Sequence, residues 1–256
     1  MNWTILTAAA VILITLFLVF PNLRKTWYLP KRKGFVAFMY HHVAPQTPEK
    51  FDPFTVEPEM LEKHILFLKE KGYTPISLKE LQSGAAVSNP VMLTFDDGYA
   101  DAYNNLFPLL KKHNVPAVIF LITDKMGTDG YLTWEQIAEM KNSGLAEFGS
   151  HTASHRRLRS LSDEEIVQEL VKSKQALEEK LGEPVTAFCY PFGAGGFDKR
   201  VRPQVFKAGY LFDFSTKKGV NPWPWNPKKT ILRAFPRGGE TLFDYNLQVT
   251  RGQSKL

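Results

Sequence analysis

The sequence contains a single cysteine, Cys189, in 256 residues. An internal disulfide is therefore excluded, and cysteine usage leaves the redox compartment undetermined. Internal repeats and low-complexity runs are also missing, and no second folded domain is visible. About 220 residues follow the N-terminal segment, which is enough for one domain with a full hydrophobic core.

Charged residues are missing from Trp3 to Phe20, an apolar and threonine-containing run of 18 residues. This is about the minimum length of a membrane helix. No basic residue precedes the run and no small-x-small site follows it, which favours an uncleaved anchor over a cleaved signal peptide. We expect a transmembrane anchor over residues 1–22 and a basic linker over residues 23–34.

The distribution of basic residues around this run predicts an orientation. Only the terminal amine precedes the run, whereas five basic residues follow it: Arg24, Lys25, Lys31, Arg32 and Lys33. The positive-inside rule then places the domain on the cytoplasmic face of the inner (cytoplasmic) membrane. The alternative is an extracytoplasmic domain, because single-span proteins with large translocated domains are exceptions. The net charge of +6 would hold the domain against anionic headgroups, and we expect no nucleic-acid partner.

Strand-like and helical patterns alternate along residues 35–256. Helical signals include capping boxes at Thr133 with Gln136 and at Ser162 with Glu165, and stops at Gly72, Gly144 and Gly182. Repeating β/α units of this kind imply parallel strands and an α/β fold. The expected strands cover residues 35–40, 91–95, 117–122, 146–149, 187–190, 211–214 and 231–234, and the first two helices cover 58–71 and 102–112.

Two short motifs carry most of the functional signal. Asp96 and Asp97 follow the expected strand 91–95, and His151 follows the strand 146–149. If these parallel strands are neighbours, their carboxyl ends lie on one face, where α/β folds build active sites. One helical turn would bring His151 and His155 to the same side. Taken singly, an Asp-Gly turn or a His-x-x-x-His spacing also arises by chance.

Two imidazoles and one carboxylate leave coordination positions open for water and substrate. That pattern is typical of a catalytic divalent metal, with zinc expected first and cobalt, nickel or iron also accepted. A second aspartate beside the group can act as a base, so the motifs predict a hydrolase.

The segments TFDDGY at 94–99 and SHTASH at 150–155 resemble the first two motifs of the NodB-type polysaccharide deacetylases (carbohydrate esterase family four). FMYHHV at 38–43, YLTWEQI at 131–137, YPFG at 190–193 and LRAFPRG at 232–238 also fit this family. The resemblance implies a distorted (β/α) barrel of about seven parallel strands and metal-dependent removal of N-acetyl groups from amino sugars. It further implies that Asp96 is the catalytic base and that Asp97, His151 and His155 bind the metal.

The same resemblance suggests how the oxyanion and the leaving amine are handled. A backbone N–H in the loop of Tyr190, Pro191 and Phe192 would stabilise the oxyanion, with Tyr190 the first choice. The acid should be a histidine, and none follows His155. The family members with a carboxyl-terminal acid histidine are therefore an incomplete match.

His64 and His113 lie within expected helices, which leaves His41 and His42 as candidate acids. Deacetylases of poly-N-acetylglucosamine use the histidine of a Tyr-His pair, which Tyr40 and His41 match. His41 is preferred and His42 is the alternative. Strand alternation would send the two side chains to opposite faces, so at most one should reach the site.

One departure from the family concerns the arginine that orients the catalytic aspartate. Cys189 occupies its place in the CYPFG segment. Arg233 matches a different family position and could hold Asp96 in a charge-assisted pair, although a surface ion pair is as reasonable from sequence.

The side of the membrane on which the domain lies distinguishes between two expected substrates. A cytoplasmic domain would act on a polyprenyl-phosphate-linked N-acetylhexosamine, or its N-formyl counterpart, in envelope glycan or lipid A modification. An extracytoplasmic domain would act on polymeric N-acetylglucosamine of a biofilm or cell wall. A non-catalytic carbohydrate-binding barrel and a peptide or small-amide hydrolase are further alternatives.

Overall fold

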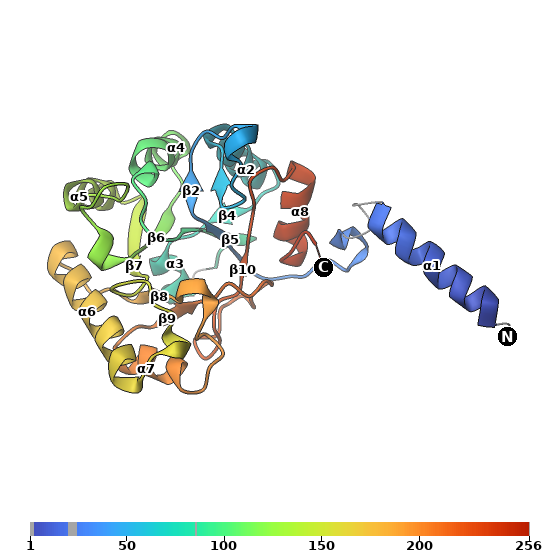
Figure 1. Ribbon diagram of the computed structural model, residues 1–256. Helices are drawn as coiled ribbons and strands as arrows, with labels where there is room; N and C mark the ends of the chain where they lie inside the picture. The colour runs from blue at the N-terminus through green and yellow to red at the C-terminus, as the bar shows by residue number, and fades with distance from the viewer. Residues whose placement is uncertain (1–2, 20–24, 85, 256) are drawn as a thin grey trace.

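The structure of the protein is a computed structural model that describes residues 3–19, 25–84 and 86–255. Its centre is a nearly closed barrel of seven parallel strands in the order β10-β1-β5-β6-β7-β8-β9 (Figure 1). The strands are β1 (Val36–Tyr40), β5 (Pro90–Phe95), β6 (Ala117–Leu121), β7 (Ala146–Ser150), β8 (Ala187–Cys189), β9 (Phe212–Phe214) and β10 (Arg233–Ala234). The predicted α/β barrel is confirmed.

The remaining strands are short. β4 (Thr74–Pro75) pairs with the start of β5, and β2 (His42–Val43) pairs with β3 (Thr55–Val56) in a separate two-stranded sheet. A parallel bridge between Phe214 and Ile231 brings the chain just before β10 beside the end of β9. Because β10 also pairs with β1, this bridge links the two edges of the sheet.

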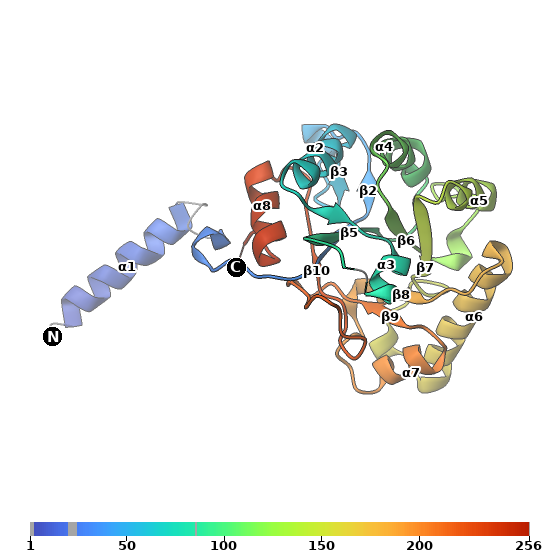
Figure 2. The same cartoon turned by 180° about the vertical axis from the view of Figure 1, so that it is seen from behind.

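All helices but the N-terminal one lie around the barrel, and the N-terminal helix projects away from it, as the two opposite views show (Figures 1 and 2). The interior strands are buried along their whole length, which is usual for a parallel sheet covered by helices. The helices are α1 (Trp3–Val19), α2 (Pro58–Glu70), α3 (Leu78–Ser83), α4 (Phe107–His113), α5 (Trp134–Asn142), α6 (Asp163–Leu181), α7 (Val201–Lys207) and α8 (Leu242–Arg251). A π-helical turn, Ala102–Leu106, precedes α4.

Local signals explain several helix boundaries. The predicted capping boxes are present at Thr133 with Gln136 before α5 and at Ser162 with Glu165 before α6. Gly182 ends α6 in the left-handed conformation with φ of 68°, which glycine adopts without steric cost. Three helices, α3, α7 and α8, were not predicted from the sequence, although α3 and α8 also begin with capping boxes.

The N-terminal region consists of α1 and a segment that packs on α8. Among the described residues, no helix has both the length and the apolar character needed to cross a membrane. Residues 1, 2 and 20–22 of the expected anchor, and residues 23 and 24 of the expected linker, lie outside the described residues. The segment 25–34 is held by a 2.9 Å ion pair between Lys25 and Asp244 and by bonds from Arg251 to the carbonyls of Trp27 and Leu29.

Candidate active site

The candidate residues meet at the carboxyl edge of the barrel, around a cavity of about 620 Å³. Asp96 and Asp97 follow β5, His151 follows β7 and His41 follows β1. The strands β5 and β7 are parallel but not neighbours as expected, because β6 lies between them. The curvature of the barrel brings their ends together instead.

Asp97, His151 and His155 form a compact group of metal-ligating atoms. The Nε2 atoms of His151 and His155 lie 3.4 and 3.3 Å from Oδ1 of Asp97, and the three ligand atoms are all within 4.8 Å of one another. Asp97 Oδ1 is buried and has no hydrogen-bond partner among the described residues. A buried carboxylate oxygen without a donor is costly unless a cation satisfies it. This donor set fits a divalent metal with open positions.

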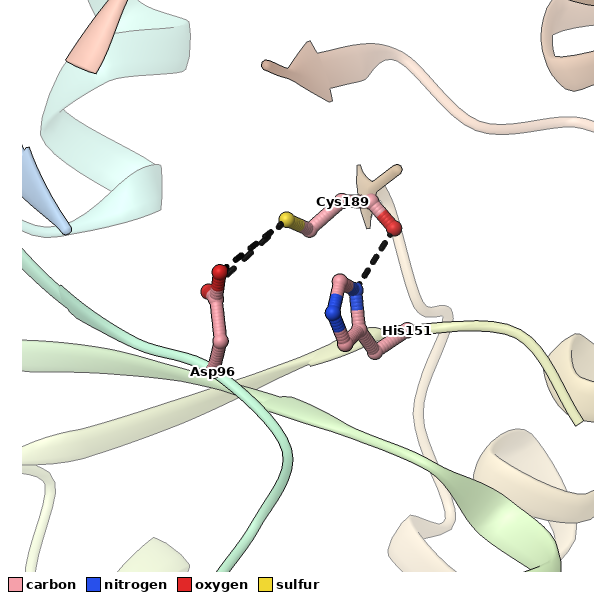
Figure 3. A group of neighbouring side chains, drawn as sticks. All are labelled: Asp96, His151 and Cys189. Atoms are coloured by element: carbon pink, nitrogen blue, oxygen red, sulfur yellow. Dashed lines mark hydrogen bonds between the residues drawn. The ribbon is translucent and has the colours of Figure 1, made fainter. Parts of the chain in front are cut away.

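A second group, Asp96, His151 and Cys189, is also compact but fits a metal less well (Figure 3). Burial raises the pKa of the Cys189 thiol well above its ordinary value, which disfavours the thiolate that binds metals. Asp96 is already neutralised by Arg233. We therefore assign the metal to the group that contains Asp97.

The orientation of His151 is fixed by a backbone carbonyl. Its Nδ1 lies 2.8 Å from the carbonyl oxygen of Cys189, which can only accept a hydrogen bond (Figure 3). Nδ1 must therefore carry the proton, and the lone pair of Nε2 is free on the side that faces Asp97. Burial and the neighbouring His151 lower the pKa of His155, which keeps the neutral, metal-binding form of that ring.

The segment from His151 to His155 is a bent loop, so the expected helical turn is wrong. The two imidazoles face each other because Thr152 and His155 adopt positive φ values of 69° and 62°. The carboxylate of Glu169 in α6 accepts bonds from the N–H groups of Ala153 and Ser154 and from the Ser154 hydroxyl. These bonds satisfy two N–H groups of the turn, and the carbonyls of Thr152 and Ala153 accept bonds from the N–H groups of Thr123 and Asp124.

Backbone strain is concentrated at this site. Asp97, Thr152 and His155 are non-glycine residues in the left-handed region, with φ of 74° at Asp97. Each such conformation costs on the order of 1 kcal/mol and persists where the surrounding structure enforces it, often at functional sites. Here the strain aims the carboxylate of Asp97 and the two imidazoles at one point.

Asp96 and Arg233 form a bidentate ion pair inside the barrel. Nη1 and Nη2 of Arg233 lie 2.7 and 2.8 Å from the two carboxylate oxygens, and the arginine is completely buried. Burial alone would raise the pKa of Asp96, but the charge and hydrogen bonds of Arg233 outweigh it and hold that pKa well below its usual range. Asp96 is therefore ionised at neutral pH.

Both His41 and His42 line the cavity, so the expected split between opposite faces is wrong. β1 ends at Tyr40 and His42 begins β2, which pairs with a different strand, so alternation does not continue across the two residues. His41 Nε2 lies 4.0 Å from Asp96 Oδ2, and burial lowers its pKa although Asp96 and Asp97 favour the charged form.

His42 has a different environment from His41. Its ring stacks on Tyr99 at 3.7 Å, and its Nδ1 lies 2.6 Å from the carboxylate of Asp101. Burial opposes protonation of His42, but the bond to Asp101 raises its pKa overall.

The loop after β8 contains Tyr190, Pro191 and Phe192, the three residues expected to stabilise the oxyanion. The N–H of Tyr190 donates to the carbonyl of Phe214 at 3.1 Å, so the structure does not offer this donor to an oxyanion as expected. Pro191 has no N–H, and of the three only Phe192 lines the cavity. The Phe192 ring lies 4.7 Å from the ring of His155 and half of it is exposed.

Sequence reasoning missed several residues of the site. Glu169 could have been found, because it places a carboxylate on the apolar stripe of α6 between Ile166 and Leu170. Asp101, Tyr99 and the wall residues gave no comparable signal. The cavity wall comprises Met39, Asp52, Phe54, Tyr99, Thr216, Lys218, Phe235 and Arg237.

Residues 84–212 match the family model described as polysaccharide deacetylase. The chain is 30% identical over 187 residues to YxkH of Bacillus subtilis, provisionally named a polysaccharide deacetylase. It is 29% identical over 187 residues to the poly-β-1,6-N-acetyl-D-glucosamine N-deacetylase of Staphylococcus aureus. These matches cover 71% and 66% of this chain and 64% of each relative, less than two thirds of their length.

Solved structures give the same result. A polysaccharide deacetylase from Bacillus cereus superimposes with a TM-score of 0.77 and 28% identity, and the match covers 85% of this chain and 69% of that one. The family-model match contains Asp96, Asp97, His151 and His155 but ends before Arg233.

Proposed function

Because the chain belongs to the polysaccharide deacetylase family, we propose that it is a metal-dependent hydrolase that removes the N-acetyl group from an amino sugar. The observation that carries this proposal is the partnerless, buried oxygen of Asp97 between two imidazoles, next to the ionised Asp96. Metal ligands and a base in one cavity are what amide hydrolysis requires. A non-catalytic binding barrel would not need either.

Asp97, His151 and His155 would hold the divalent ion, with zinc expected first. When bound, such an ion lowers the pKa of a water molecule and polarises an amide carbonyl. Asp96 accepts a proton from the attacking water as the new C–O bond forms. Arg233 holds both oxygens of Asp96 and so fixes the direction from which that proton is taken.

The C–N bond breaks when the leaving amine receives a proton. We assign this step to His41, because its Nε2 lies 4.0 Å from Asp96 and its ring contacts the rings of Phe54 and Phe235 in the cavity wall. His42 is the alternative acid. Full activity of His41→Ala together with loss of activity in His42→Ala would reverse the assignment.

The acyl-bearing substrate is an N-acetylhexosamine, and two forms have support. The named activity of the Staphylococcus aureus relative supports polymeric N-acetylglucosamine. The apolar run 3–20 and the basic residues after it support a lipid-linked amino sugar at the cytoplasmic face of the membrane, possible also in N-formyl form. A reporter enzyme fused to the carboxyl end tests the location, and activity of an extracytoplasmic reporter would contradict the cytoplasmic one.

The activity itself is tested by acetate release from a β-1,6-linked N-acetylglucosamine oligomer and from a lipid-phosphate-linked N-acetylglucosamine. Asp96→Asn should abolish release from either substrate, whereas Asp198→Asn, at a carboxylate that pairs with Arg159 and does not line the cavity, should leave it unchanged. Release of acetate by Asp96→Asn at the wild-type rate would refute the proposed base.

A further inference from the structure

The walls of the active-site cavity carry two cations that the mechanism does not use. Lys218 and Arg237 line the same cavity as the metal-ligand group, and both side chains are exposed. Among the described residues, neither has a carboxylate within ion-pair distance. The Arg237 guanidinium instead lies 5.2 Å from the centre of the Phe235 ring.

The acidic groups nearby are already engaged. Asp52 accepts bonds from the Thr55 hydroxyl at 2.8 Å and from the Phe54 N–H at 3.1 Å. Glu240 contacts Gln248 at 2.6 Å and the Ser254 hydroxyl at 3.1 Å. Asp96 is neutralised by Arg233. These carboxylates are bound to other groups, so among the described residues none of them forms an ion pair with Lys218 or Arg237.

The two cations also repel each other. The pKa of Lys218 is lowered by partial burial and by the charge of Arg237, which together outweigh the opposing charge of Glu240. A guanidinium and an ammonium that converge on one cavity form a common arrangement for binding a phosphate, which can accept hydrogen bonds from both.

Lys218 additionally lines a smaller cavity of about 230 Å³, together with Arg32 and Arg251. Shared lining means that the two cavities lie side by side. The basic surface therefore continues from the active-site mouth to the N-terminal segment that packs on α8. A substrate whose negative group lies at Lys218 could extend over this surface.

We propose that Lys218 and Arg237 bind a phosphate group carried by the amino-sugar substrate, beside the acetamido group that is hydrolysed. This inference rests on the proposed deacetylase function. A partly deacetylated, positively charged glycan would be repelled by the same two residues, so the pair selects against the product of a previous turnover. Lys218 and Arg237 act as specificity residues, outside the reacting atoms.

The test compares three probes: N-acetylglucosamine 1-phosphate, N-acetylglucosamine joined through phosphate to a short prenyl chain, and a neutral β-1,6-linked N-acetylglucosamine oligomer. The variant is Lys218→Gln with Arg237→Gln. The matched control is Lys228→Gln with Lys229→Gln, which removes the same charge in a different cavity. Unfolding midpoints of both variants check that the barrel is intact.

We expect kcat/KM for the phosphate-bearing probes to fall roughly tenfold or more in the Lys218/Arg237 variant, mainly through KM, with the neutral oligomer and the control little changed. A fall for both phosphate probes identifies the phosphate itself as the recognised group, and a fall for the prenyl probe alone identifies a lipid-linked phosphate. An equal effect on all three probes, or none on the phosphate probes, would overturn the inference while leaving the deacetylase function intact. If wild-type protein releases acetate from none of them, the proposed function fails as well.

Discussion

Arg233 shows how a single residue replaces a missing one. Cys189 stands where the related deacetylases are expected to have an orienting arginine, and its sulfur lies 3.0 Å from Nη2 of Arg233. Arg233 reaches Asp96 from β10, on the far side of β1 from the strand that precedes Asp96. Thr94 supports the same guanidinium by accepting a bond from Nη1 at 3.0 Å. The small side chain at position 189 leaves room for this approach.

Arg233→Lys should weaken catalysis and change its pH dependence. An ammonium cannot make both bonds to Asp96, so the pKa of Asp96 should rise and the acidic limb of the kcat/KM profile should move to higher pH. We expect activity at neutral pH to fall by roughly 10- to 100-fold, because the carboxylate loses its fixed orientation. The pH profile of kcat/KM measures both effects.

Arg202→Lys is the matched control for this substitution. Arg202 pairs with the buried Asp213 at 2.9 Å, away from the cavity, so this variant should lose stability without any shift of the acidic limb. If Arg233→Lys left the limb where it is in the wild type, Arg233 would not govern the protonation of Asp96.

At the scale of elements, α6 shapes the metal-ligand loop. Glu169 accepts three bonds from Ala153 and Ser154, and no other carboxylate in the described structure accepts a bond from the backbone of this loop. The loop carries His155, whose position depends on a strained backbone. A helix on the outside of the barrel thereby controls the geometry of a ligand that it does not touch.

Glu169→Gln should reduce metal affinity. A neutral amide cannot accept all three bonds, so the two imidazoles should lose their convergence on Asp97. Substitutions of residues that orient metal ligands cost about 10- to 100-fold in affinity. Competition with a chromophoric chelator measures this directly. Glu164→Gln, an exposed residue on the same helix, is the control, and equal affinities in the two variants would contradict the role of Glu169.

The helix α2 contains a buried histidine that should make stability depend on pH. His64 stacks on Tyr245 at 3.9 Å and bonds to the Tyr40 hydroxyl, and burial lowers its pKa to about 3 from the ordinary 6.5. Between about pH 3 and pH 6.5, His64 is therefore protonated in the unfolded chain and neutral in the folded protein. Stability is then lost as the pH falls below about 6.5, by about 1.4 kcal/mol per pH unit.

His64→Phe keeps the stacking and removes the titration. Urea unfolding at a series of pH values between about 4 and 6.5 should give a shallower slope of free energy against pH in this variant than in the wild type. Parallel slopes for the two proteins would show that His64 does not titrate on unfolding.

For the whole molecule, local signals predicted the alternating helices and parallel strands and the positions of the strand ends, whereas the resemblance to the family predicted the barrel. A single sequence contains signals that depend on residues close together in the chain. These signals are the apolar β-rich runs before Asp96 and His151 and the capping boxes of α5 and α6. The sequence also contains the pairing of Asp96 with Asp97, because these two residues are adjacent.

The other features of the site depend on contacts between residues that are distant in the chain. The loop from His151 to His155 takes its shape from Glu169, and β6 separates β5 from β7, so the hypothesis that these two strands are neighbours is wrong. The turn of the chain from β1 into β2 places both His41 and His42 in one cavity, because β2 pairs with β3 and not with the barrel. Spacing along the sequence contains none of this information.

In the proposed mechanism, Asp97, His151 and His155 hold a divalent ion on which amide hydrolysis depends. The most direct measurement titrates zinc into chelator-treated protein and follows bound metal and acetate release from an N-acetylglucosamine oligomer in the same samples. We predict that activity rises in proportion to bound metal and saturates near one ion per chain, and that Asp97→Ala neither binds the ion at the same level nor regains activity. Acetate release by the fully metal-free protein, or by Asp97→Ala at the wild-type rate, would contradict the account.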